Sequence, residues 1–348
     1  MVKSVAIQGS KVTVEVFLTI KACPMQDNIM SRVRAAVFEI EGVEDVDVRL
    51  DVMNDEQRSA LREKLTGPNK GIPFADPTST TKIYAIASGK GGVGKSSLTD
   101  NLAVAMAQQG YSVGIIDADV YGHSIPGILG LTSTATFVDK DLRMPPQAHG
   151  VKALSMLSFK PGGKPEPVAF RGPMLAKVLE QFLSDFYWGD LDVLLLDLPP
   201  GTGDIAISTA QLLPNAQLVI VTTPQDIALL DARKGVAMFD KVGVPILGVV
   251  ENMAMHVCTN CGHVEHIFGE DGGKRYAAEK GIDYLGALPL NMQIRLQADT
   301  GKPTVVSDPD GDVAGIYKAV ARQVAIKVAA KAKDFSSKFP SIKISKDT

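Results

Sequence analysis

Short hydrophobic runs alternate with helical patterns along most of the chain, from Lys82 onward. The runs are rich in β-branched residues and nearly continuous in hydrophobicity, which is typical of parallel strands covered on both faces. Residues 82–330 are therefore predicted to form one α/β domain, with a mostly parallel sheet and helices on both faces. The predicted strands are Ile83–Ala87, Val113–Asp117, Val193–Asp197, Leu218–Thr223, Ile246–Val250 and Tyr284–Ala287.

A second, smaller pattern fills residues 1–66. Hydrophobic residues at every second position alternate with mostly polar ones, and a helical repeat of hydrophobic residues follows. This pattern predicts a small separate α/β domain. Its predicted elements are a strand over Val12–Ile20, a helix over Ile29–Ile40 that begins after Asp27 or Asn28, a strand over Val46–Leu50 and a short helix over Asp55–Leu65.

Two further segments lack such patterns. Residues 67–81 are rich in Pro, Gly and Thr, which predicts a linker between the domains. Residues 331–348 carry five Lys and two Asp, which predicts a basic flexible tail. Phe335, Phe339 and Ile342 of this tail fall at helical spacing beside lysines, as in a helix on a membrane surface. Pro340 interrupts that helix, so we expect no stable membrane association.

The composition is that of an ordinary globular protein, with 45% hydrophobic and 22% charged residues among 348. The formal net charge of -3 argues against a protein that coats nucleic acid. No hydrophobic run approaches the roughly 18 residues that suggest a spanning helix, and the N-terminus lacks the pattern of a secretory signal. Three cysteines cannot form a disulfide framework. We therefore expect a cytoplasmic protein that binds no nucleic acid.

A glycine-rich loop, SGKGGVGKSS, occupies residues 88–97 between a predicted strand and a predicted helix. It contains G-x-x-x-x-G-K-[ST], in which backbone N–H groups surround a polyphosphate and the helix N-terminus faces the same charge. Lys95 is expected to reach the β- and γ-phosphates of ATP, and the Ser96 hydroxyl to bind Mg²⁺. The predicted nucleotide-binding residues of the loop are Gly89, Lys90, Gly91, Gly92, Val93, Gly94, Lys95, Ser96 and Ser97.

Acidic residues end two of the predicted strands. Asp197 follows the hydrophobic run LLL and precedes a Gly/Pro loop, so it fits the Walker B acid that holds Mg²⁺ together with Ser96. Asp117 and Asp119 follow another predicted strand. The carboxyl ends of parallel strands lie on the side where α/β sheets bind ligands. We therefore expect these acids close to the glycine-rich loop.

Two cysteines, Cys258 and Cys261, form a C-x-x-C pair with histidines on both sides. One interpretation is a zinc site closed within one chain by two of His256, His263 and His266. A second is a half-site, in which a two-fold axis supplies the other cysteine pair for a [4Fe–4S] cluster. A third is a catalytic dithiol, although no thioredoxin-like context surrounds the pair. The spacing alone leaves these alternatives open.

The glycine-rich loop resembles the deviant Walker A class of MinD, ParA and the nitrogenase iron protein, because Lys90 directly follows its first glycine. The resemblance implies that Lys90 crosses a dimer interface to the partner's nucleotide, where it acts with Lys95 in catalysis. It also implies that Asp119 orients or activates the attacking water. Without the resemblance, Lys90 is a solvated charge of the loop.

The motifs SGKGGVGKSS, DADVYGHS, FRGPM, LLDLPPGTGD, TTPQDIALLDARK, ENM with the C-x-x-C pair, and FGEDGGKR together resemble the Mrp/ApbC family. The family implies an ATP-hydrolysing iron–sulfur cluster carrier with a P-loop NTPase fold. It further implies a homodimer that bridges a labile [4Fe–4S] cluster on Cys258 and Cys261 of both subunits, receives it from a scaffold and delivers it to apo-proteins. Asn252 is implied as an adenine contact, with a loop-capping role as the alternative. We have no physical role for Arg171 of FRGPM.

The N-terminal unit resembles the MIP18-like small domain that is often fused to members of this family. Cys23 and Pro24 match the Cys-Pro turn of that domain, where Cys23 is either a transient ligand or a small core residue. The helix and acidic turn that usually open the domain have no counterpart here, which predicts a truncated version.

The alternative function for the whole chain is a MinD/ParA-type positioning ATPase with a structural zinc site at the cysteine pair. Electron transfer, a third possibility, usually uses cluster cysteines that lie far apart in sequence.

Overall fold

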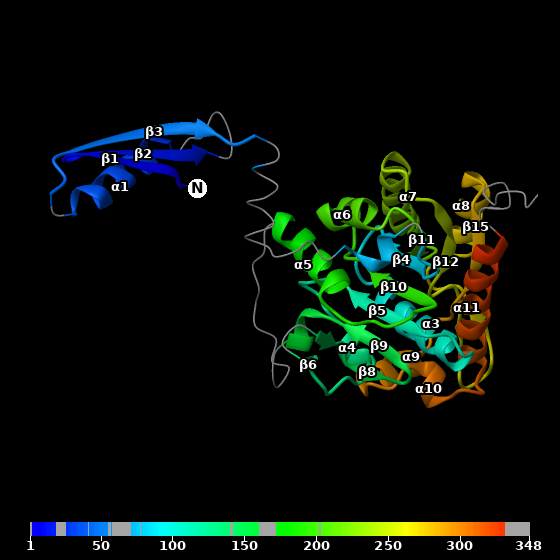
Figure 1. The fold of residues 1–348 in the computed structure, drawn as a ribbon. Coiled ribbons are helices and arrows are strands. Elements are labelled where there is room, and N and C mark those ends of the chain that lie inside the picture. The colour runs from blue at the N-terminus through cyan, green and yellow to red at the C-terminus, as the bar shows by residue number, and fades with distance from the viewer. Residues whose placement is uncertain are drawn as a thin grey trace, which may run out of the picture. The chain divides into compact units, whose positions relative to one another are not determined.

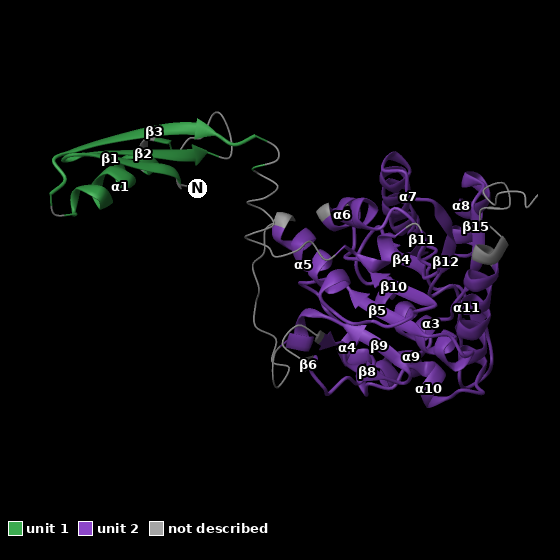
Figure 2. Ribbon diagram, viewed as in Figure 1, with its two compact units in different colours: residues 1–70 green, residues 71–348 purple. Residues whose placement is uncertain are grey.

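The computed structural model describes residues 2–18, 26–40, 42–54, 57, 71–76, 78–139, 142–159, 172–201 and 203–330. The chain divides into two compact units, residues 1–70 and residues 71–348 (Figure 2). Each unit has its own hydrophobic core. The two units are therefore described one at a time.

Unit 1 is a three-stranded sheet with one described helix (Figure 1). The middle strand pairs antiparallel with β1 and parallel with β3. Its valines at alternate positions, Val12, Val14 and Val16, are buried in the core of the unit. The helix packs against β3. The elements are β1 Val2–Gln8, β2 Lys11–Leu18, α1 Gln26–Phe38 and β3 Asp45–Val52.

Two features of unit 1 differ from the prediction. Strand β1 was not predicted, because only Val5 and Ile7 repeat at the two-residue period of a strand and Lys3 and Ser4 break the pattern before them. Helix α1 begins at Gln26, so the predicted start after Asp27 or Asn28 is wrong: the polar first turn carries no hydrophobic repeat that would reveal it. The predicted helix over Asp55–Leu65 lies outside the described residues apart from Gln57. Cys23 also lies outside them.

Unit 2 contains an eight-stranded sheet in the order β15-β12-β11-β4-β10-β5-β9-β8 (Figure 1). All pairs are parallel except β8 with β9. The six predicted strands are confirmed to within one or two residues. Strands β8 and β9 were not predicted, because each is short and their hydrophobic run is broken by polar residues. The strands are β4 Lys82–Ser88, β5 Val113–Asp117, β8 Gln147–Ala148, β9 Val151–Leu154, β10 Val193–Asp197, β11 Gln217–Thr222, β12 Ile246–Glu251 and β15 Asp283–Ala287.

Helices cover both faces of this sheet, as predicted (Figure 1). Because side chains alternate along a strand, β4 sends Tyr84 and Ile86 into the core beneath α3 and α11, and Ile83 and Ala85 into the core on the other face. The first face carries α3 Lys95–Gln108, α4 Ile125–Ile128, α10 Thr304–Ser307 and α11 Asp312–Ala330. The other carries α5 Gly172–Ser184, α6 Asp204–Leu212, α7 Asp226–Lys241 and α8 Gly272–Lys280.

Smaller elements complete the unit. Part of the predicted linker packs on it: the side chain of Phe74 is 3% exposed and meets the ring of Trp188 edge-on. The remaining elements are the 3₁₀ helices η1 Pro73–Ala75 and η2 Met156–Phe159, the hairpins β6 Thr136–Asp139 with β7 Leu142–Met144 and β13 His256–Val257 with β14 Val264–Glu265, and α9 Met292–Asp299.

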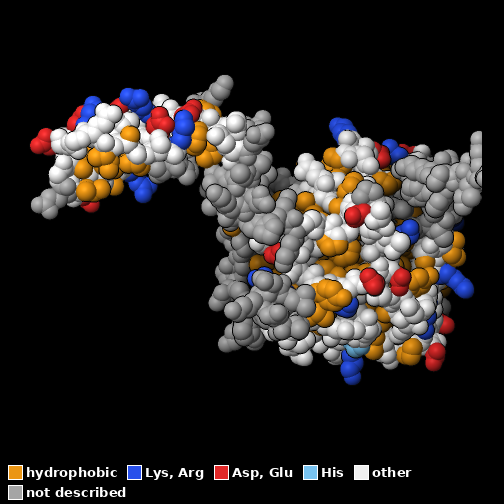
Figure 3. Space-filling view, in the orientation of Figure 1, with side chains coloured by type: hydrophobic (Ala, Val, Ile, Leu, Met, Phe, Trp, Pro, Cys, Tyr) orange, Lys and Arg blue, Asp and Glu red, His pale blue; other side chains and the backbone are white. Residues whose placement is uncertain are grey.

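The described surface carries charges of both signs. Lys and Arg side chains are interspersed with Asp and Glu on the face that Figure 3 shows. Within the described part of the chain, no helix has the length and hydrophobicity needed to cross a membrane. The predicted tail, residues 331–348 with Phe335, Phe339 and Ile342, lies outside the described residues.

Candidate functional site

The glycine-rich loop joins β4 to α3 and is held from two sides. A Cβ atom at Gly89 would lie 2.2 Å from the backbone carbon of Asp231 in α7, so only glycine allows this close approach. Gly94 precedes α3 with φ +82°, and a Cβ there would lie 2.1 Å from the side-chain nitrogen of Asn252. The loop is therefore packed against α7 and against the end of β12.

Lys95, Ser96 and Asp197 meet in one hydrogen-bonded group beneath this loop. Lys95 Nζ lies 2.7 Å from Asp197 Oδ2, and Ser96 Oγ donates to the same oxygen at 2.6 Å. Thr99 Oγ1 donates to Asp197 Oδ1 at 2.7 Å. The Lys95 and Asp197 side chains are 8% and 0% exposed, so their ion pair is shielded from water. A hydroxyl and a carboxylate side by side are the oxygen donors that Mg²⁺ prefers, so these residues fit that ion.

Two further acids lie buried near this group. Asp117 accepts backbone N–H groups from Asp119, Ser124 and Ile125. Burial raises the pKa of Asp117, and the charge of Asp197 raises it further. Burial likewise raises the pKa of Asp100 on α3, and neither of its carboxyl oxygens has a hydrogen-bond partner in the described part of the chain.

Asp119 and Lys90 are more accessible than these buried acids. Asp119 is partly buried, and its Oδ1 accepts the backbone N–H of Gly122 at 2.9 Å. Lys90 Nζ lies 3.4 Å from Oε1 of Gln225, the residue before α7. Its position within one chain is therefore at the start of α7.

Asn252 follows β12 and touches the loop directly. Its Nδ2 donates to the Val93 carbonyl at 2.8 Å, and its Oδ1 accepts the N–H of Met253 at 2.9 Å. Asn252 also lines a cavity of about 480 Å³ with Gly94 and Ser97 of the loop and with residues of α9. These hydrogen bonds are those of the loop-capping alternative, and the adenine contact stays a prediction.

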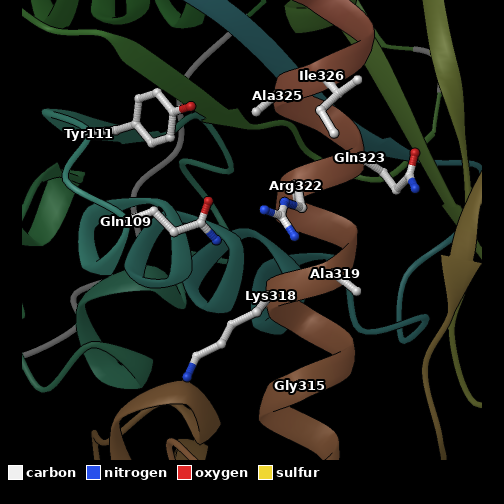
Figure 4. Close-up of a pocket in the computed structure, with 9 residues that line it drawn as sticks. All are labelled: Gln109, Tyr111, Gly315, Lys318, Ala319, Arg322, Gln323, Ala325 and Ile326. Atoms are coloured by element: carbon white, nitrogen blue, oxygen red, sulfur yellow. The ribbon is translucent and has the colours of Figure 1, made fainter.

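A larger cavity, of about 810 Å³, lies at the other end of α3. Gln109 at the end of α3 and Arg322 of α11 line this cavity (Figure 4). Lys318 of α11 also lines it, and its Nζ donates to the Pro309 carbonyl at 2.6 Å. Helix α3 begins at Lys95 and has 14 residues, so it spans about 20 Å at 1.5 Å per residue. This groove is therefore separate from the glycine-rich loop.

The cysteine pair lies in the turn of the β13–β14 hairpin. The Cys258 N–H donates to the His263 carbonyl, and the Gly262 N–H donates to the Cys258 carbonyl, each at 2.9 Å. Backbone N–H groups of Cys261 and Asn260, together with the Cys261 thiol, lower the pKa of Cys258. Cys258 is partly exposed and Cys261 is exposed. The hairpin thus presents two neighbouring thiols, the donor atoms that iron–sulfur clusters and zinc bind.

The neighbouring histidines make other contacts. Nδ1 of His256 lies 3.1 Å from the Leu290 carbonyl, and Nδ1 of His266 lies 3.0 Å from the Ala254 carbonyl. Among the described residues, no group of three or more His, Cys, Asp or Glu side chains is arranged to hold a metal ion. The two thiols are therefore the metal-binding groups that the hairpin presents together within the described residues.

Comparison with known proteins identifies the family. The profile described as NUBPL iron-transfer P-loop NTPase matches residues 79–325. The chain belongs to this family. A second profile, described as iron-sulfur cluster assembly protein, matches residues 1–50. The two resemblances drawn from the sequence, one for the P-loop domain and one for the small N-terminal domain, are therefore confirmed.

Relatives and solved structures agree with this result. The iron-sulfur cluster carrier protein of Mycobacterium bovis is 48% identical over 322 residues, which cover 90% of this chain and 84% of that protein. A nucleotide-binding protein from Archaeoglobus fulgidus, solved with ADP, is 34% identical with a TM-score of 0.57, covering 68% of this chain and 91% of its own. MinD from Pyrococcus horikoshii, solved with Mg-ADP, is 24% identical with a TM-score of 0.53, covering 73% and 99%. The last shows the fold alone.

Sequence reasoning missed two residues of this P-loop NTPase that the site contains. Thr99 lies one helical turn after Lys95, which is the signal that could have placed it beside the same acid. Asp100 gave no signal, because an acid within a helix is ordinarily exposed. Arg171 lies outside the described residues.

Proposed function

We propose that this chain is an ATP-binding and ATP-hydrolysing carrier of a labile [4Fe–4S] cluster. The cluster is its cargo, held between two copies of the chain by Cys258 and Cys261 of each, received from a scaffold and delivered to apo-proteins. The observation that carries the proposal is the exposed two-thiol hairpin to which the described residues add no third ligand. Four cysteines complete such a site only when two copies meet.

The cysteine chemistry supports this cargo. Thiolates are the ligands of iron–sulfur clusters, and a lowered pKa places more of Cys258 in the thiolate form at neutral pH. The hairpin is exposed rather than enclosed in a core. An exposed site releases its cargo more readily than a buried one, which suits delivery. The naming of a relative at 48% identity as a cluster carrier points the same way.

The glycine-rich loop supports the nucleotide part of the proposal. Lys95 would bind the β- and γ-phosphates, and Ser96 and Asp197 would hold Mg²⁺, which supplies charge neutralisation on the phosphates. Asp119 would orient the attacking water. Lys90 would reach the nucleotide of the partner copy, where a cation stabilises the charge that develops in phosphoryl transfer.

Anaerobic reconstitution with iron and sulfide tests the cargo. We expect about one cluster per dimer, consistent with ligation by four cysteines. Cys258→Ser and Cys261→Ser should each abolish cluster binding and delivery to an apo-protein. Iron, acid-labile sulfide and zinc are measured on each variant, together with ATP binding, which should survive both changes because the loop lies elsewhere.

Three matched variants complete this experiment. Cys23→Ser removes the third cysteine of the chain and should leave most of the cluster in place. His263→Ala and His266→Ala should also leave it in place. Stoichiometric zinc in a monomer, lost when either histidine is replaced, would instead support the positioning ATPase with a structural zinc site.

A further inference from the structure

The segment that follows β12 connects the glycine-rich loop with the cysteine hairpin. It consists of Asn252, Met253, Ala254 and Met255, and the hairpin begins at His256. Asn252 is 7% exposed and donates to the Val93 carbonyl in the middle of the loop. The Asn252 side chain is therefore hydrogen-bonded to the Val93–Gly94 peptide of the loop.

The other end of the segment is bonded to the base of the hairpin. His266 Nδ1 lies 3.0 Å from the Ala254 carbonyl, which can only accept, so the ring N–H is the donor. His256 Nδ1 lies 3.1 Å from the Leu290 carbonyl, and the Leu290 N–H donates to the Met255 carbonyl at 2.7 Å. His266, which follows β14, is thus bonded to Ala254. His256 in β13 is bonded to Leu290, which in turn is bonded to Met255.

The ends of this connection are anchored. Glu251 is 1% exposed and its carboxylate accepts the backbone N–H of Gly273 at the start of α8, beyond the hairpin. The Ala254 N–H donates to the Leu288 carbonyl at 2.9 Å. Asn252, Ala254 and Met255 each form a backbone hydrogen bond with a residue outside the segment. The Met253 N–H instead donates to the side chain of Asn252 within it, so we take the backbone at Met253 as the joint of the segment.

Met253 has the backbone conformation expected of such a joint. Its φ is +57°, in the left-handed region that a long side chain rarely occupies and that costs backbone energy. Its N–H is held by Asn252 Oδ1, so the same amide that bonds the loop also holds Met253 in this conformation. When the Val93 carbonyl moves, Asn252 moves with it, and Met253 can relax toward an ordinary conformation.

We infer that Asn252 is a positioning residue that transmits the nucleotide state of the glycine-rich loop to Cys258 and Cys261 through Met253 and the His266 contact. The inference rests on the proposed function, because it gives ATP a physical route to the cluster site. Filling the loop with Mg-ATP draws its backbone N–H groups toward the phosphates. The hairpin then changes position relative to β12, and with it the exposure of the two thiols.

Thiol reactivity tests this route without any cluster. The reduced, cluster-free full chain is treated with iodoacetamide, and the alkylation of Cys258 and Cys261 is followed by mass spectrometry with and without saturating Mg-ATP analogue. We expect the nucleotide to change the rate about fivefold or more in the wild type, the lower range of allosteric couplings. Asn252→Ala should remove this nucleotide response, with saturation verified by direct binding of a fluorescent analogue.

Two further variants keep the test decisive. Met253→Gly leaves the Asn252 amide in place but removes the backbone strain, and it should also weaken the response. It carries the test if Asn252→Ala fails to fold or to bind. Asn215→Ala is the matched control. Asn215 lies just before β11, and its side-chain amide likewise donates to a backbone carbonyl, that of Phe74. It should keep the full response.

Two outcomes would overturn the inference. One is a wild-type chain whose thiols react at the same rate with and without the analogue. The other is a full response in both Asn252→Ala and Met253→Gly at saturating analogue. Oligomeric state is measured by light scattering in each sample, so that shielding by a second copy is recognised. Because the readout needs no iron, a failure of cluster binding leaves this result intact, and the two proposals fail separately.

Discussion

At the scale of single residues, Asp100 is an uncompensated acid. Burial raises its pKa, and the charges of Asp197 and Asp117 raise it further. A folded-state pKa above the unfolded value contributes stability at low pH that is lost as pH rises. We therefore expect Asp100→Val to increase the free energy of unfolding by about 1–3 kcal/mol at pH 8, the cost of an unpaired buried polar group. The gain should shrink toward pH 5, measured by urea unfolding. The exposed Asp310→Ala is the control and should change little. A gain independent of pH would contradict an elevated pKa.

At the scale of elements, α3 has a glycine with positive φ at each end, Gly94 at +82° and Gly110 at +93°. Alanine at Gly110 meets no atom within 4 Å, so it should cost only the left-handed backbone, about 1–2 kcal/mol. Alanine at Gly94 should cost more, because its Cβ overlaps the Asn252 amide. Adding Asn252→Ala should recover part of this difference in a double-mutant cycle of unfolding free energies. Equal losses at the two glycines would show that Asn252 yields freely.

At the scale of the whole molecule, the proposed dimer predicts that catalytic residues complement one another. Lys90→Ala and Asp119→Asn should each lower ATP hydrolysis about 100-fold or more, as loss of a charge-stabilising group does. A 1:1 mixture should recover roughly a quarter of the wild-type rate, because half of the dimers are mixed and each holds one complete site. ATPase rate against mixing ratio is the measurement. A mixture as inactive as its components would place Lys90 on the nucleotide of its own chain.

Much of the fold could be predicted, because its signals are local. The six strands stand out as hydrophobic runs, and each pairs in the parallel sheet. Strands β8 and β9 escaped prediction, since two and four residues carry too little pattern. Strand β1 escaped prediction because its strand pattern is limited to the single pair Val5 and Ile7. The start of α1 escaped because its polar first turn shows no repeat.

The sequence by itself determined the elements, the glycine-rich loop and the cysteine pair, because each depends on residues that are neighbours along the chain. The tertiary structure decided which distant groups meet. Asn252 bonds a carbonyl 159 residues away, and Thr99 bonds an acid 98 residues away. It also decided that His256 and His266 bond backbone carbonyls and that Asp100 has no hydrogen-bond partner among the described residues. Such contacts depend on strand order and register, which bring together side chains that lie far apart in the sequence. Their spacing along the chain does not indicate that they are in contact.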